Sequence, residues 1–283
     1  MKVKIITDST CDLPKELLKK YDIDIVTLYI ILNEKNYKER IEINQQQVID
    51  WSNENNKPPK TGAPTVDDFV EVFSKYADTH REIIFIGTSG ETTATCQAGQ
   101  VAADMLPNQR IKILDGRSLT CGTALLVYTA GKMAQDGKPF DEIVEKVNEM
   151  IPRVFITFMP EKLDFLRRGG RCSTMQYFAA SSLNIKLEII AKDGFLVPAK
   201  KYRGSLPKVV NKYFEDRLEN INDIEPDTIF IVYTVDDANL LSSLINIVKS
   251  KNYFKEIIPI QASCIVTAHS GPNTYSMAYM RKN

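Results

Sequence analysis

The first half of the chain alternates strand-like with helix-like stretches, and this alternation limits the possible folds more than any other feature. The strand-like segments are 2–7, 22–32, 83–86 and 110–114, and the helix-like segments are 15–20, 44–53, 67–76, 97–106, 119–135 and 141–150. Strands that alternate with helices predict a parallel sheet covered by helices. Such sheets bind ligands at the carboxyl ends of their strands.

The pattern changes near residue 151. Asp193-Gly194 is a strong turn signal between two strand-like runs, so it predicts a hairpin. The other predicted strands are 153–159, 228–234, 256–261 and 264–268, and the predicted helices are 162–168, 175–182, 206–218, 238–249 and 274–280. We therefore expect an N-terminal parallel-sheet α/β domain, residues 1–151, followed by an α+β domain, residues 152–283, with a largely antiparallel sheet.

The segment 83–99 is the strongest candidate for a binding loop. A β-branched strand runs into Gly87, Ser89 and Gly90, and three threonines precede a predicted helix. Free N–H groups and the helix dipole at such a point favour an anionic group, phosphate or carboxylate. The alternative is that Thr92 or Thr93 only caps the helix.

Other polar residues occupy similar positions. Asp12 could cap the helix that has Pro14 as an early position, or the strand end Asp8-Ser9-Thr10 could present polar groups to a ligand. Thr65 and Asp68 have the spacing of a capping box. Thr61 lies outside that cap, so its hydroxyl needs another explanation.

Two further residues allow both a binding and a structural interpretation. Arg171 follows Gly169-Gly170, where it could reach an anion or a partner surface, or only be solvated. His269 could hydrogen-bond an anionic ligand, hold a threonine in place or be structural.

The composition excludes several classes of function. Lys+Arg and Asp+Glu both number 36, so there is no net charge to attract nucleic acid. Two histidines and no CxxC pair argue against a metal site, and five dispersed cysteines indicate reduced thiols in the cytoplasm. The apolar run 23–32 is too short for membrane insertion. Neither GxxxxGK[ST] nor a strand-linked GxGxxG is present, so no nucleotide motif is found.

Several short segments, in this order, resemble the DegV family. They are 6–14, Thr61-Gly62-Ala63-Pro64-Thr65, 92–98, Asp115-Gly116-Arg117-Ser118, 163–173, Asn184-Ile185-Lys186, 200–204 and 269–272. The resemblance implies a two-domain protein that holds one long-chain fatty acid. It also implies an acyl-binding subunit that presents the carboxylate to an ATP-binding fatty acid kinase, whose acyl phosphate feeds phospholipid synthesis.

The resemblance assigns roles to five residues. Thr61 and Thr93 would contact the carboxylate, the Ala94 N–H would add a donor, and His269 would complete the cluster. Arg171 would lie outside it and assist the kinase or the transferring phosphate. The bound fatty acid would be the only ligand, with no cofactor and no catalytic residue.

The chain departs from the family pattern at two places. Thr92-Thr93-Ala94-Thr95 stands where Leu-Ser-Gly-Thr is usual, and Asn273-Thr274 stands where small residues are usual. Threonine keeps the hydroxyl and adds a methyl group, whereas alanine restricts the backbone more than glycine.

The main expectation is therefore a non-catalytic lipid carrier. One alternative is a hydrolase or transferase that acts on acyl esters through Ser9, Thr93 and His269. Another is a regulator that binds a small anion at the strand–helix edge and has no deep apolar slot.

Overall fold

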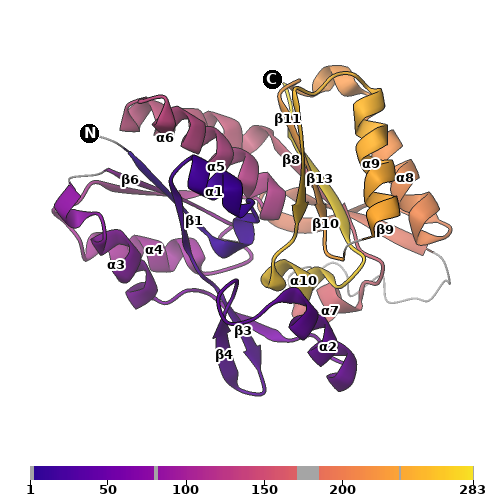
Figure 1. Cartoon of the computed structure of the whole chain (residues 1–283), viewed down its shortest axis with the longest axis horizontal. Coiled ribbons are helices and arrows are strands. Elements are labelled where there is room, and N and C mark those ends of the chain that lie inside the picture. Colours follow the sequence, from indigo (N-terminus) through magenta and orange to yellow (C-terminus); the bar gives the residue numbers. More distant parts are fainter. Residues whose placement is uncertain (1–2, 80–81, 171–184, 236, 283) are drawn as a thin grey trace.

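The computed structural model describes residues 3–79, 82–170, 185–235 and 237–282. Within these residues the first sheet is four-stranded and parallel, as predicted, with the order β2-β1-β6-β7 (Figure 1). Its strands are β1 (Lys4–Asp8), β2 (Ile23–Val26), β6 (Ile83–Gly87) and β7 (Ile111–Asp115).

Helices cover both faces of this sheet. On one face, α3 (Val66–Ser74) and α4 (Thr95–Asp104) pack on it through a cluster that includes Phe69, Phe73 and Phe85. The helices packed with the opposite face are α1 (Lys15–Lys20), α5 (Thr120–Gln135) and α6 (Phe140–Met150). The predicted capping box at Thr65 and Asp68 is present, so aspartate can take the place of the more usual glutamate.

Helix α5 joins the two halves of the molecule. It contacts β1 and β6 of the first sheet and β8, β11 and β13 of the second. Its side chains are buried on nearly every face, which is typical of a helix packed between two layers. One continuous apolar core therefore runs from Ile84 through Leu126 to Phe230.

The second sheet is six-stranded and largely antiparallel, as predicted. Its order is β10-β9-β8-β13-β11-β12, and only the β11–β12 pair is parallel. The strands are β8 (Val154–Met159), β9 (Ile185–Lys192), β10 (Phe195–Arg203), β11 (Thr228–Tyr233), β12 (Glu256–Gln261) and β13 (Tyr275–Met280). Its outer face is covered by α8 (Leu206–Arg217) and α9 (Ala238–Ser250) (Figure 1).

The sequence did not predict a third sheet, which is small and antiparallel with the order β4-β3-β5. Its strands are β3 (Tyr29–Leu32), β4 (Lys35–Lys38) and β5 (Lys60–Gly62). The expected single strand 22–32 is in fact two strands, because β2 pairs with β1 whereas β3 pairs with β4 and β5. Helix α2 (Gln45–Asn55) connects β4 to β5.

The predicted strand 264–268 and helix 274–280 were both wrong. Cys264–Ser270 forms the helix α10, which Ser263 caps by accepting a hydrogen bond from the Val266 N–H. That cap and packing against α2 outweigh the strand propensity of Ile265 and Val266. Residues 275–280 form β13, an inner strand between β8 and β11.

Asp12 does not cap the following helix. Helix α1 begins after Pro14, which is its N-cap residue without a side-chain hydrogen bond. Asp8 instead caps the 3-10 turn Ser9–Cys11. Further 3-10 turns are Ala77–Thr79, Ile151–Arg153 and Ile221–Asp223, and the remaining helix is α7 (Asp164–Gly169). The helix expected at 175–182 lies outside the described residues.

Candidate functional site

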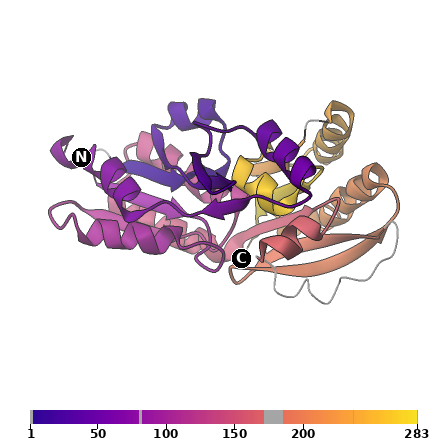
Figure 2. The same ribbon diagram turned by 90° about the horizontal axis from the view of Figure 1, so that it is seen from below.

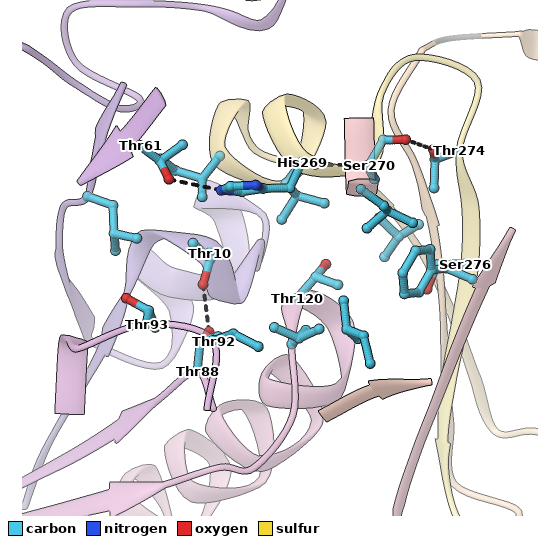
Figure 3. A pocket seen from close by; sticks show the side chains of 18 of the residues that line it. Thr10, Thr61, Thr88, Thr92, Thr93, Thr120, His269, Ser270, Thr274 and Ser276 are labelled. Carbon is cyan, nitrogen blue, oxygen red and sulfur yellow. Dashed lines mark hydrogen bonds between the residues drawn. The ribbon is translucent and has the colours of Figure 1, made fainter. Parts of the chain in front are cut away.

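A cavity lies between the two halves of the chain, where the loops of the first sheet face the second sheet (Figure 3). It encloses about 930 Å³ of empty space, including the part at its mouth that opens to solvent. Residues of both halves line this cavity, with Thr10 and Thr88 from the first half and Ile156 and Val232 from the second.

Much of the wall is apolar. The apolar lining residues are Leu28, Leu119, Ile156, Phe158, Leu166, Leu196, Val232, Ile265 and Val266, together with Ala63. Among the lining residues, all of which belong to the described part of the chain, none is Lys, Arg, Asp or Glu. The cavity therefore favours a ligand with a large apolar part, and it offers no ion pair.

The rest of the wall consists largely of threonine and serine, but most of these hydroxyls are already engaged. Thr120 donates to Asp12 Oδ2 at 2.6 Å, and Ser276 donates to the Thr157 carbonyl at 2.8 Å. Ser270 and Thr274 also donate to backbone carbonyls. A hydroxyl that already donates within the protein can only accept a hydrogen bond from a ligand, so these four groups offer no donor to an anion.

Thr61 and His269 form the central polar pair of the cavity. Thr61 lies on β5 and His269 near the end of α10, and Thr61 Oγ1 is 2.9 Å from His269 Nε2 (Figure 3). When Nε2 carries the proton, the imidazole donates to Thr61 Oγ1. The Thr61 hydroxyl hydrogen can then be donated to a ligand, and an anion is the natural acceptor.

Thr93 lines the same cavity, just before α4. Its hydroxyl is 2.8 Å from Thr95 Oγ1, and either oxygen can be the donor. The neighbouring Thr92 hydroxyl donates to the Ser89 carbonyl instead. In the described structure the N-cap residue of α4 is Ala94, which has no side-chain cap, so neither Thr92 nor Thr93 caps the helix. Ala94 is exposed and is not among the lining residues.

The two glycines at the C-terminal end of α7 have different roles. A Cβ atom on Gly169 would lie 2.7 Å from His269 Nδ1, so only glycine leaves room for the imidazole ring at its present position. Gly170 has φ of +68° and ends the helix in the left-handed conformation. Arg171, which follows them, lies outside the described residues.

Asp8 connects the loops that follow β1 and β6. Its carboxylate accepts hydrogen bonds from the Thr10 N–H at 2.9 Å and from the Thr88 N–H at 2.7 Å. Complete burial raises the pKa of Asp8, and these hydrogen bonds oppose that effect. Thr10 and Thr88, whose hydroxyls lie 2.6 Å apart, contribute to the cavity wall.

The structure does not bring Ser9 together with Thr93 and His269. Ser9 is fully buried and is not a lining residue, and its hydroxyl oxygen accepts a hydrogen bond from the Leu28 N–H at 3.0 Å. A ligand in the cavity therefore meets Thr93 and His269 but not Ser9, the third residue of the hydrolase or transferase alternative.

Thr61, Thr93 and His269, which the sequence analysis singled out, all line this cavity, whereas the residues of its apolar wall were not predicted. Thr10 and Thr88 follow strand ends, and that position was an available signal for both. The apolar wall residues, such as Ile156 and Val232, lie in strands and look like ordinary core residues in the sequence. No pattern in a single sequence separates the two.

The described residues include neither a metal cluster nor a membrane-spanning helix. No described group of three or more His, Cys, Asp or Glu residues could hold a metal ion. None of the helices in the described segments has both the length and the apolar character needed to cross a membrane.

Comparisons with known proteins agree with this architecture. A family model described as "Uncharacterised protein, DegV family" matches residues 2–282. A DegV domain-containing protein of Clostridium acetobutylicum is 32% identical over 283 residues, which cover 99% of each chain.

Solved structures share the fold. A fatty-acid-binding DegV family protein from Thermus thermophilus has a TM-score of 0.91 and 24% identity, with 99% of this chain and 100% of that chain covered. A stearic-acid-binding protein from Eubacterium ventriosum has a TM-score of 0.85 and 22% identity, with 99% and 98% covered. The family match and the relative, each over nearly the whole length, show that this chain belongs to the DegV family.

Proposed function

We propose that the protein binds one long-chain fatty acid, with the carboxylate at Thr61, Thr93 and His269. The acyl chain would run along the apolar wall. The observation that carries this proposal is a cavity with neutral hydrogen-bonding groups and no charged side chain among its described lining residues. In domain terms, residues 1–151 would supply Thr61 and Thr93, and residues 152–283 would supply His269 and most of the acyl-chain pocket.

Burial of the acyl chain supplies most of the binding free energy. A tail of roughly 14–16 methylenes, at about 0.8 kcal/mol each, offers on the order of 11–13 kcal/mol before the cost of association. The head group then needs orientation more than affinity. Neutral donors can provide that orientation without the desolvation cost of a buried ion pair.

Neutral donors also suit a carboxylate that must later react. An arginine bound to the carboxylate would lower its nucleophilicity toward a γ-phosphate. Hydroxyl groups and the Ala94 N–H carry no full charge and would leave the carboxylate more nucleophilic. We therefore propose that the protein has no catalysis of its own and presents the carboxylate to an ATP-binding fatty acid kinase in the cytoplasm. Arg171 would contact the kinase or the transferring phosphate.

Support for the ligand class comes from similar proteins of the same fold. The Thermus thermophilus protein is described as fatty-acid-binding, and the Eubacterium ventriosum protein binds stearic acid. The apolar wall and neutral polar groups of the cavity suit such a ligand, and its loop has Thr92-Thr93-Ala94-Thr95 where Leu-Ser-Gly-Thr is usual in the family.

Native mass spectrometry of the purified protein tests the proposal. We expect an added mass of one long-chain fatty acid, which organic extraction removes and added palmitate restores. A protein that carries no lipid, takes up no palmitate and cleaves acyl esters would instead support the hydrolase or transferase.

Replacement of Arg171 tests the kinase part of the proposal. Arg171→Ala should retain the fatty acid in native mass spectra but lose acyl-phosphate formation when the kinase and ATP are added. Loss of the fatty acid instead would place Arg171 in the binding site and contradict its assignment to the kinase.

A further inference from the structure

The small sheet β4-β3-β5 contacts helix α10 at both of its ends. At the C-terminal end, Thr61 on β5 lies 2.9 Å from the His269 imidazole. At the N-terminal end, Glu39, directly after β4, accepts a hydrogen bond from the Ile265 N–H at 2.8 Å. Ile265 and His269 are four residues apart, so they lie on the same side of the helix, one turn from each other.

Glu39 is an integral part of this sheet region. It is fully buried, and its own N–H donates to the Leu28 carbonyl at 3.0 Å. Its second carboxylate oxygen, Oε2, is buried without a hydrogen-bond partner among the described residues, while the Ser9 side chain also favours the charged carboxylate. A buried carboxylate with only part of its hydrogen-bonding capacity used is costly.

Asp12 supports the same end of the helix. Its Oδ1 accepts a hydrogen bond from the Ser263 N–H at 3.0 Å and lies 3.6 Å from Arg40 Nη2. Between the two ends, apolar residues of α10 pack against Ile30 and Val48 of the first half. Figure 2 shows the yellow α10 beside α2, so this helix, distant in sequence, docks on the N-terminal half.

We propose that Glu39 is a positioning residue for the carboxylate site. It fixes the first turn of α10 against the small sheet and thereby places His269 opposite Thr61. Because α10 has only seven residues, a shift of its first turn moves the imidazole at its end. This role rests on the proposed fatty acid site, but the position of His269 can be measured without a ligand.

The test compares three substitutions of Glu39 by NMR of the histidine side chains in lipid-free protein. The chain has two histidines, His80 and His269, so a His80→Gln variant assigns the two signals. Glu39→Ala should shift the His269 signal and weaken palmitate binding on the order of ten-fold, because the buried Ile265 N–H loses its acceptor. Glu39→Gln keeps an acceptor oxygen, so its His269 signal and its palmitate affinity should be those of the wild type. Glu39→Asp is too short to reach Ile265 and should behave like Glu39→Ala.

Glu42 provides the matched control. It lies three residues away and is exposed, and its carboxylate accepts a hydrogen bond from the Lys38 N–H rather than from α10. Glu42→Ala should leave the His269 signal and the affinity unchanged. If Glu39→Ala and Glu39→Asp lower thermal stability but leave the His269 signal unchanged, Glu39 is only structural and the inference is overturned. A wild-type protein that binds no palmitate would contradict the proposed function, while the NMR comparison would still test Glu39.

Discussion

At the scale of single residues, neighbouring threonines of one loop differ in what their hydroxyls do. The Thr92 hydroxyl donates to the Ser89 carbonyl, whereas the Thr93 hydroxyl lies next to that of Thr95 and can turn toward a ligand. Thr93→Val should therefore weaken fatty acid binding about ten-fold, which corresponds to roughly 1.4 kcal/mol. A displacement assay with a fluorescent fatty acid measures the change.

Thr92→Val is the control for this substitution. It makes the same chemical change at the adjacent lining residue, and we expect an affinity within about a factor of two of the wild type. Equal losses for the two variants would show that the loop as a whole, and not the Thr93 hydroxyl, determines the affinity.

Thr61 and Asp12 show what the sequence alone can and cannot predict about single residues. The unexplained hydroxyl of Thr61 was a sound signal, because that hydroxyl proves to pair with His269. Asp12 was misjudged, because its position before a helix predicts a cap, while its real partners, Thr120 and Ser263, are more than one hundred residues away. Local spacing cannot reveal such partners.

At the scale of elements, the packing of α7 against α10 fixes the position of the His269 imidazole ring. Gly169→Ala would place a methyl carbon 2.7 Å from His269 Nδ1, so the ring must move. We expect palmitate affinity to fall on the order of ten-fold, while the helix content in circular dichroism stays unchanged. An affinity of Gly169→Ala equal to that of the wild type would contradict the packing argument.

Elements with a clear sequence signal, either hydrophobic periodicity or a turn, were predicted correctly. The amphipathic helix α3 and the β9–β10 hairpin are present as expected. The segment 264–280 was assigned in reverse, because β-branched residues dominate α10 and because β13 is buried on both faces, which removes the alternation typical of a strand. Tertiary packing decided both elements.

At the scale of the whole molecule, buried carboxylates between the two halves make stability depend on pH. Burial raises the pKa of Glu39 from 4.5 to about 7 and that of Asp12 from 3.8 to about 6. Because the pKa of each carboxyl group is raised by folding, its contribution to the stability of the fold is complete at a pH below its pKa in the unfolded chain. This contribution is lost as the pH rises through the pKa in the folded chain, where the buried group becomes charged.

Glu39→Gln should therefore raise the melting temperature at pH 8 by a few degrees, at about 2–4 °C per kcal/mol, and much less at pH 5. Differential scanning calorimetry from pH 5 to pH 8 measures this difference. The exposed Glu42→Gln control should show no such dependence on pH. A melting temperature of Glu39→Gln that stays below that of the wild type at pH 8 would contradict the assigned cost of the buried charge.

The central claim concerns where a fatty acid carboxylate binds, and ¹³C NMR of carboxyl-labelled palmitate tests it most directly. We predict one bound carboxyl signal, distinct from that of free palmitate, which shifts in Thr61→Val and in His269→Gln. The absence of a bound signal, or a bound signal that neither substitution moves, would contradict the claim.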